Sequence, residues 1–257
     1  MRTLANMTVD YHGLMLLTFY TVYLLGLDEK LRATAISTPL TPEQPLVAPL
    51  LRALSSLHKS FVCEQTVPLV FGCMEALGGV GYLENHESQH INVARLFRDA
   101  CVGAIWEGTT DVLAGDTIRA VKHAKTGRET LEGLEWFVNA GLERCKKGKM
   151  NGMGESVRGK WEGLRERIEK GRQEELLPEA RGVVFRLAEV MIAVLYLVDA
   201  SVHPGAEIEE MCKRYLVKTG FLEEEEGKGR KDLAMDQAIV YGVGKVPGQG
   251  AAAGAKL

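Results

Sequence analysis

Two histidines four residues apart form the most specific chemical pattern in the chain. The stretch HESQH matches H-E-x-x-H, in which His86 and His90 would share one helical face and hold Zn²⁺. Glu87 would activate a zinc-bound water, and Glu107 follows at a distance that suits a third ligand. The surrounding sequence YLENHESQH is polar, and Asn85 as an N-cap would place His86 in a fraying first turn. We therefore favour surface histidines over a zinc metalloprotease and expect no metal site.

Three further motifs follow one another with short gaps. They are MEALGGVGYLE (74–84), RLFRDA (95–100) and IWEGTTD (105–111). In this order they resemble the C-terminal helical domain of acyl-CoA dehydrogenases, most closely the adaptive-response, AidB-type branch. LANMTVDYHGLMLLTF, near the start of the chain, is similar to an earlier helix of the same domain, so the resemblance covers roughly residues 3–124.

The resemblance gives Glu107 a role in catalysis. It implies that Glu107 removes the α-proton of an acyl-CoA thioester while FAD takes a hydride from the β-carbon. Trp106 and Gly108 would lie against the substrate. Trp106 would help to form a dry, apolar pocket, which strengthens a carboxylate as a base, and Gly108 would leave room for the thioester. Without the resemblance, Glu107 is better explained as an acidic residue favoured by the dipole at a helix start.

Two groups of residues correspond to positions that contact FAD in this family. The first group, three glycines, would touch FAD, often that of a neighbouring subunit. The second group, residues 109–111, would open a helix whose free N–H groups suit an electron-rich part of the cofactor. A helix stop followed by a turn explains the glycines equally well, and N-capping explains the threonines. The residues are Gly78, Gly79, Gly81, Thr109, Thr110 and Asp111.

The family assembles its site from an N-terminal helical domain, a β-domain and this C-terminal domain. The first two are not evident in the sequence, so we expect a fragment that binds FAD poorly and lacks dehydrogenase activity by itself. The family also implies a homo-oligomer in the full-length form.

A basic stretch at residues 144–172 favours one alternative function. It carries ten basic residues against four acidic ones, and AidB-type relatives have a helical extension associated with DNA. Ion pairs along a solvated helix explain such a run more simply, so we do not favour nucleic-acid binding. The basic residues are Arg144, Lys146, Lys147, Lys149, Arg158, Lys160, Arg165, Arg167, Lys170 and Arg172.

Helical periodicity dominates the chain and no strand-type alternation is evident, so the sequence predicts an all-α fold resembling a four-helix bundle. The very apolar segment 183–198 should form the core of the second half. We expect a family-type bundle at 1–126, a helical extension at 127–226 and a weakly ordered helix with a flexible tail at 227–257. The predicted helices cover 3–27, 45–77, 92–100, 110–124, 129–147, 155–171, 179–202 and 205–220.

Composition and targeting signals narrow the class of protein further. Residues 11–27 are uncharged and mostly apolar but short of the roughly 20 residues that span a bilayer, so we expect a buried helix and no membrane segment. The net charge of −3 gives no overall positive field that would attract nucleic acid. The five cysteines form no C-x-x-C pair, which argues against a zinc ribbon and a disulfide framework. The chain ends in Ala255-Lys256-Leu257, a variant of the peroxisomal address S-K-L, which predicts import into peroxisomes. The alternative is a cytoplasmic or mitochondrial location.

Overall fold

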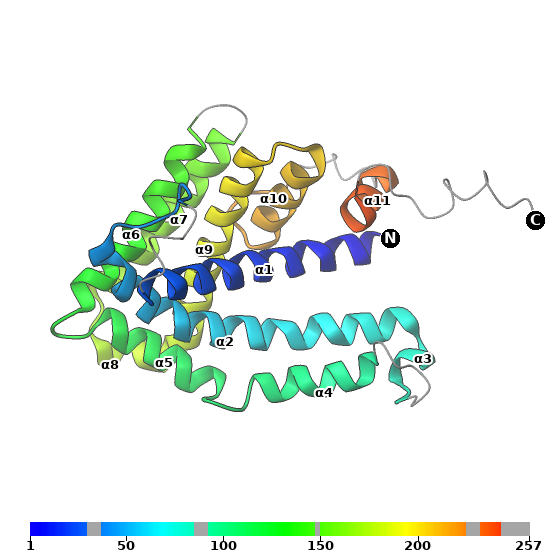
Figure 1. Ribbon diagram of the computed structural model, residues 1–257, viewed down its shortest axis with the longest axis horizontal. Helices are drawn as coiled ribbons and strands as arrows, with labels where there is room; N and C mark the ends of the chain where they lie inside the picture. Colours follow the sequence, from blue (N-terminus) through cyan, green and yellow to red (C-terminus); the bar gives the residue numbers. More distant parts are fainter. Residues whose placement is uncertain (30–36, 85–91, 147–149, 225–231, 243–257) are drawn as a thin grey trace, which may run out of the picture.

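The computed structural model describes residues 1–29, 37–84, 92–146, 150–224 and 232–242. Within these ranges the chain contains helices and no strand, which confirms the all-α prediction (Figure 1). The helices are α1 (Arg2–Asp28), α2 (Gln44–Leu77), α3 (Gly79–Tyr82), α4 (Val93–Gly103), α5 (Thr110–Val121), α6 (Gly127–Arg144), α7 (Asn151–Lys170), α8 (Gln173–Leu176), α9 (Ala180–Val202), α10 (Ala206–Lys218) and α11 (Leu233–Tyr241), with a 3₁₀ turn at Leu177–Glu179.

The longest helix, α2, is the scaffold for the first half of the molecule. It has 34 residues and starts with Pro45 in its first turn, where a missing backbone N–H costs nothing. It packs against α1, α4, α5 and α6, and Figure 1 shows α4 running alongside its second half. Gly78 stops it with φ of 65°, a left-handed conformation that glycine adopts without a steric penalty.

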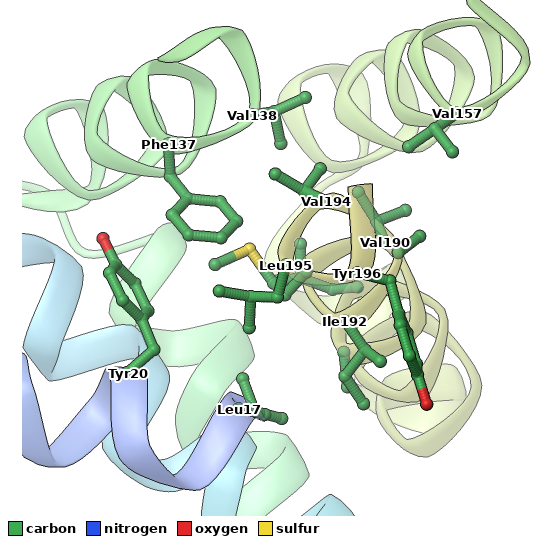
Figure 2. Packing of buried hydrophobic residues seen from close by; sticks show 14 of the residues in the cluster. Leu17, Tyr20, Phe137, Val138, Val157, Val190, Ile192, Val194, Leu195 and Tyr196 are labelled. Atoms are coloured by element: carbon green, nitrogen blue, oxygen red, sulfur yellow. The ribbon is translucent and has the colours of Figure 1, made fainter. Parts of the chain in front are cut away.

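The core of the second half is α9, as the apolar segment 183–198 predicts. Helix α9 packs against α1, α2, α5, α6, α7 and α10, and most of its residues are buried. Figure 2 shows Val194 and Leu195 of α9 facing Phe137 of α6 and Leu17 of α1. The Tyr196 hydroxyl donates to the Val9 carbonyl at 2.5 Å, which joins α9 to α1. Residues on both sides of the expected boundary at 126 therefore share one hydrophobic core.

Helix α1 differs from the expectation of burial on all sides. Its inner face is buried, but the side chains of Tyr11 and Phe19 are 60% and 65% exposed. They border a mostly apolar cavity of about 560 Å³ between α1 and α2, which Val240 of α11 also lines. No helix in the described ranges is long and apolar enough to cross a membrane.

The last described helix, α11, lies within the region expected to hold a weakly ordered helix, and a buried carboxylate fastens it. Asp236 is 2% exposed, and its carboxylate pairs with Arg2 at 3.1 Å and with Arg214 at 2.8 Å. Two guanidinium partners compensate the desolvation of the buried charge. This arrangement holds α11 beside the start of α1, as Figure 1 shows.

The contact between α6 and α9 leaves no room for another carbon atom at Gly141. A Cβ there would lie 2.2 Å from Val194 Cγ1, and valine has little rotamer freedom to move away. We predict that Gly141→Ala lowers the free energy of unfolding by about 1–3 kcal/mol in urea denaturation. Gly159→Ala on α7, where a Cβ meets nothing within 4 Å, is the matched control and should stabilise the chain by up to about 1 kcal/mol. Equal effects of the two substitutions would contradict this packing.

Candidate active site

The predicted base lies in a tight connection between two helices. Helix α4 ends at Gly103 and α5 begins at Thr110. In this connection Glu107 has φ of 53° and Gly108 has φ of 109°. Among the described residues, Glu107 is the single non-glycine residue with positive φ, a conformation that costs an L-residue about 1–2 kcal/mol. Strain of this kind concentrates at functional sites, so the backbone marks the same residue as the sequence motif.

One lysine holds the connection in place. The Lys59 ammonium on α2 donates to the carbonyl oxygens of Gly103 at 2.6 Å, Trp106 at 3.0 Å and Gly108 at 3.3 Å. Two of these carbonyls belong to the neighbours of Glu107 on either side. The sequence reasoning missed Lys59, because a single lysine on a helix carries no spacing signal that links it to a loop 44 or more residues away.

The side chains around Glu107 are open to solvent. Ile105 and Trp106 are 63% and 60% exposed, and Glu107 itself is exposed. The described residues therefore do not by themselves form the dry pocket that the resemblance implies. The cavity between α1 and α2 does not supply it either, since none of the predicted site residues lines that cavity.

The start of α5 presents polar groups beside Glu107. Thr109 is the N-cap, yet its side chain makes no capping hydrogen bond, so it leaves the first-turn N–H groups open to another partner. Thr110 is buried, with 5% of its surface exposed. Asp111 forms an ion pair with Arg181 of α9, with 2.8 Å between Nε and Oδ1. Helix α9 of the extension at 127–226 thus contacts a residue predicted to bind the cofactor. The sequence did not indicate this contact.

An ion pair further along α5 fixes that helix to α2. Arg52 donates to both carboxylate oxygens of Asp116 at 2.8 Å, and Ser56 donates to Asp116 Oδ2 at 2.5 Å. These hydrogen bonds, chiefly those from Arg52, hold the pKa of Asp116 below its ordinary value. The clamp contributes stability while the carboxylate is ionised and loses it as the pH falls through that lowered pKa. Glu107 is thereby positioned between two helices, α4 and α5, that both rest on α2.

The three glycines lie at the far end of α2 and not beside Glu107. Lys59 and Gly78 belong to one continuous helix and its cap, which places them about 28 Å apart along the axis. Gly81 is explained by packing, because a Cβ there would lie 2.4 Å from the Met74 carbonyl oxygen. A Cβ at Gly79 meets nothing within 4 Å. The predicted cofactor residues therefore form two separate groups, one at each end of α4.

Comparison with known proteins agrees with the motifs and the helical architecture. Residues 2–122, which comprise α1 to α5, match the family model described as acyl-CoA dehydrogenase, C-terminal domain. This part of the chain is similar to the C-terminal domain of the acyl-CoA dehydrogenase family. The resemblance inferred from the sequence motifs is thus confirmed, and its extent agrees with the expected residues 3–124.

Two relatives align with parts of this chain. Acyl-CoA dehydrogenase family member 11 of Caenorhabditis elegans is 38% identical over 117 residues, which cover 46% of this chain and 16% of that protein. AidB of Escherichia coli (strain K12) is 34% identical over 70 residues, which cover 27% of this chain and 12% of that protein. The chain therefore spans a small part of the length of the relatives that it matches.

The alternative functions are a zinc metalloprotease and a nucleic-acid-binding protein. His86, Glu87 and His90 lie outside the described residues, and within the described ranges no group of three His, Cys, Asp or Glu side chains could hold a metal ion. The zinc site thus stays an untested hypothesis.

In the basic stretch at residues 144–172, six side chains form ion pairs with glutamates, as the sequence predicts for a solvated helix. This pairing leaves less positive charge for nucleic acid to bind. The six side chains are Lys146, Arg158, Arg165, Arg167, Lys170 and Arg172.

The glycines of the α2–α3 turn can be separated by substitution in the isolated chain. We predict that Gly81→Ala lowers the free energy of unfolding by about 1–3 kcal/mol, because the new Cβ meets backbone that cannot rotate away. Gly79→Ala is the control and should leave stability unchanged within about 0.5 kcal/mol. Urea denaturation without flavin measures both. If Gly81→Ala were as stable as the parent chain, packing would not explain this glycine.

Proposed function

We propose that the chain contributes the catalytic base to a flavin-dependent acyl-CoA dehydrogenase, which oxidises the α,β-bond of an acyl-CoA thioester. The observation that carries the proposal is Glu107 in a left-handed turn between α4 and α5, inside the segment that matches the family. A strained glutamate at a fixed point between two anchored helices suits a base that must meet one carbon atom.

The chemistry assigned to this chain is the removal of one proton. The Glu107 carboxylate would take the α-proton of the thioester, and its exposure makes it reachable by a substrate. Gly108 has no side chain beyond its backbone, so the thioester can approach the connection closely. The exposed Trp106 offers an apolar surface that would exclude water from the carboxylate once substrate covers it.

The residues present suit one edge of FAD. The first-turn N–H groups of α5 are left uncapped by Thr109, which is exposed and supplies a hydroxyl beside them, whereas Thr110 is buried. Asp111 would contribute through its ion pair with Arg181, which places a cation next to the same helix start. FAD, when bound, accepts the hydride that leaves the β-carbon.

The glycine turn fits a separate role in the same proposal. Gly78, Gly79 and Gly81 lie about 28 Å from the Lys59 region along α2, too far to share one flavin ring with Glu107. Gly79 has open space around it and could admit a cofactor closely. We infer that this turn contacts the FAD of a neighbouring subunit in a homo-oligomer, so one chain would serve two sites.

The activity can be tested by placing residues 2–122 into the Caenorhabditis elegans relative in place of the matched segment. We expect the chimera to purify with flavin and to bleach when acyl-CoA is added, whereas the isolated chain should bind FAD poorly. Glu107→Gln should slow bleaching by at least about a hundredfold, because the amide cannot accept the α-proton. Glu43→Gln, at an exposed position just before α2, is the control and should bleach at the parent rate. A flavin-loaded chimera that ignores acyl-CoA, or an unaffected Glu107→Gln variant, would refute the proposal.

We also propose that the C-terminal Ala255-Lys256-Leu257 directs the protein to peroxisomes, where acyl-CoA oxidation takes place. A fluorescent protein fused to the N-terminus should accumulate in peroxisomes, and removal of the last three residues should leave it diffuse. The same fluorescent protein carrying only this tripeptide is the positive control. Diffuse fluorescence with the tail intact and accessible would contradict the proposal.

A further inference from the structure

The bonding of Lys59 is specific to the Glu107 connection. An ammonium group has three N–H donors, and the three carbonyl oxygens of Gly103, Trp106 and Gly108 lie within hydrogen-bond distance of this one. Lys59 extends from the middle of α2 between Leu57 and Ser60, which are 0% and 1% exposed. The lysine is thus anchored on a long helix and reaches the connection between α4 and α5.

These contacts exceed what is needed to end a helix. A cation that only caps α4 would bind the last helical carbonyls, such as that of Gly103. Lys59 also binds the carbonyls of Trp106 and Gly108, which precede and follow Glu107 directly. The Trp106 carbonyl belongs to the peptide group that precedes Glu107, and the Gly108 carbonyl belongs to the peptide group after Gly108. Fixing both groups to one ammonium restrains the chain on either side of Glu107, the residue with φ of 53°.

We propose that Lys59 is a positioning residue for the catalytic base, holding Glu107 in its left-handed conformation through the two neighbouring carbonyls. The inference rests on the proposed function, since it treats Glu107 as the base. Because the carbonyls occupy the three ammonium donors, the lysine orders the backbone and leaves the Glu107 carboxylate oxygens available for a proton. A lysine paired directly with the carboxylate would compete with the substrate for those oxygens.

The test uses the chain without flavin, so that it does not depend on dehydrogenase activity. Lys59→Met keeps the length of the side chain and removes its donors, and Lys59→Arg restores a cation with donors. Lys122→Met is the matched control, because Lys122 also donates to a backbone carbonyl, that of Glu169 at 3.0 Å, but on another part of the molecule. Nuclear magnetic resonance reports the Glu107 Cα chemical shift, which depends on φ, together with amide exchange across residues 105–109.

We expect Lys59→Met to move the Glu107 shift away from its left-handed value and to speed amide exchange in this segment about tenfold. Lys59→Arg should return both toward the parent chain, and Lys122→Met should change neither. A Glu107 shift that is unchanged in Lys59→Met would overturn the inference, and so would an equal response to Lys122→Met.

A measurement on the unaltered chain keeps the inference testable if Lys59→Met does not fold. A Lys59 ammonium bound to three carbonyls should give a side-chain resonance that exchanges slowly with water, in contrast to solvated lysines. Rapid exchange of this resonance would overturn the inference.

Measurements on the chimera distinguish the proposed dehydrogenase function from the positioning role of Lys59. In the flavin-loaded chimera, Lys59→Met should lower kcat with little change in KM, because the substrate still binds while the base is misplaced. If the parent chimera were inactive, the proposed function would fail while the resonance results stood by themselves. If the parent were active and Lys59→Met kept its kcat, the positioning role would fail and the function would stand.

Discussion

The site depends on a cation that binds carbonyl groups at a sharp turn. Helix α4 must end, a glutamate must take up a left-handed conformation, and α5 must begin, all between Gly103 and Thr110. Carbonyl groups at the end of a helix lack intrahelical hydrogen-bond donors. Here the Lys59 ammonium donates to the carbonyls of Gly103 and Trp106. Since Lys59 belongs to α2, the position of Glu107 is fixed relative to the helix on which α1, α4, α5 and α6 all pack.

The extension beyond the family-matched segment is part of the same structure. Helix α9 contributes to the core shared with α1, α2 and α5, and its Arg181 pairs with Asp111 at the start of α5. The matched segment ends at residue 122, but its helices bury their inner faces against residues well beyond that point. The packing of α9 thereby bears on the helix start that follows Glu107.

The sequence predicts the larger elements well because their signals are local. The apolar run 183–198 indicates a buried helix, and Gly78 indicates the end of α2. The prediction fails where signals are weak or distant. Helix α7 begins at Asn151, four residues before the predicted start, because Gly152 and Gly154 lower helix propensity while tertiary packing buries Gly154. The short helices α3 and α8 have too few residues for a periodic pattern.

For the site, motif similarity identifies Glu107 but gives no account of what holds it. The left-handed φ of Glu107 contradicts the preference of an L-residue, and the interaction that compensates it comes from Lys59, far away in the sequence. The pairing of Asp111 with Arg181, 70 residues away, is equally invisible to local patterns. The resemblance also implies an enclosed pocket, whereas the described residues leave Trp106 and Glu107 exposed.

The central claim is that Glu107 removes the α-proton. The most direct measurement compares the rate of flavin bleaching in the chimera with ordinary acyl-CoA and with acyl-CoA deuterated at the α-carbon. If Glu107 is the base, deuteration slows bleaching in the parent, and Glu107→Gln slows bleaching by at least about a hundredfold with either substrate. A Glu107→Gln chimera that bleaches at the parent rate with both substrates would contradict the account.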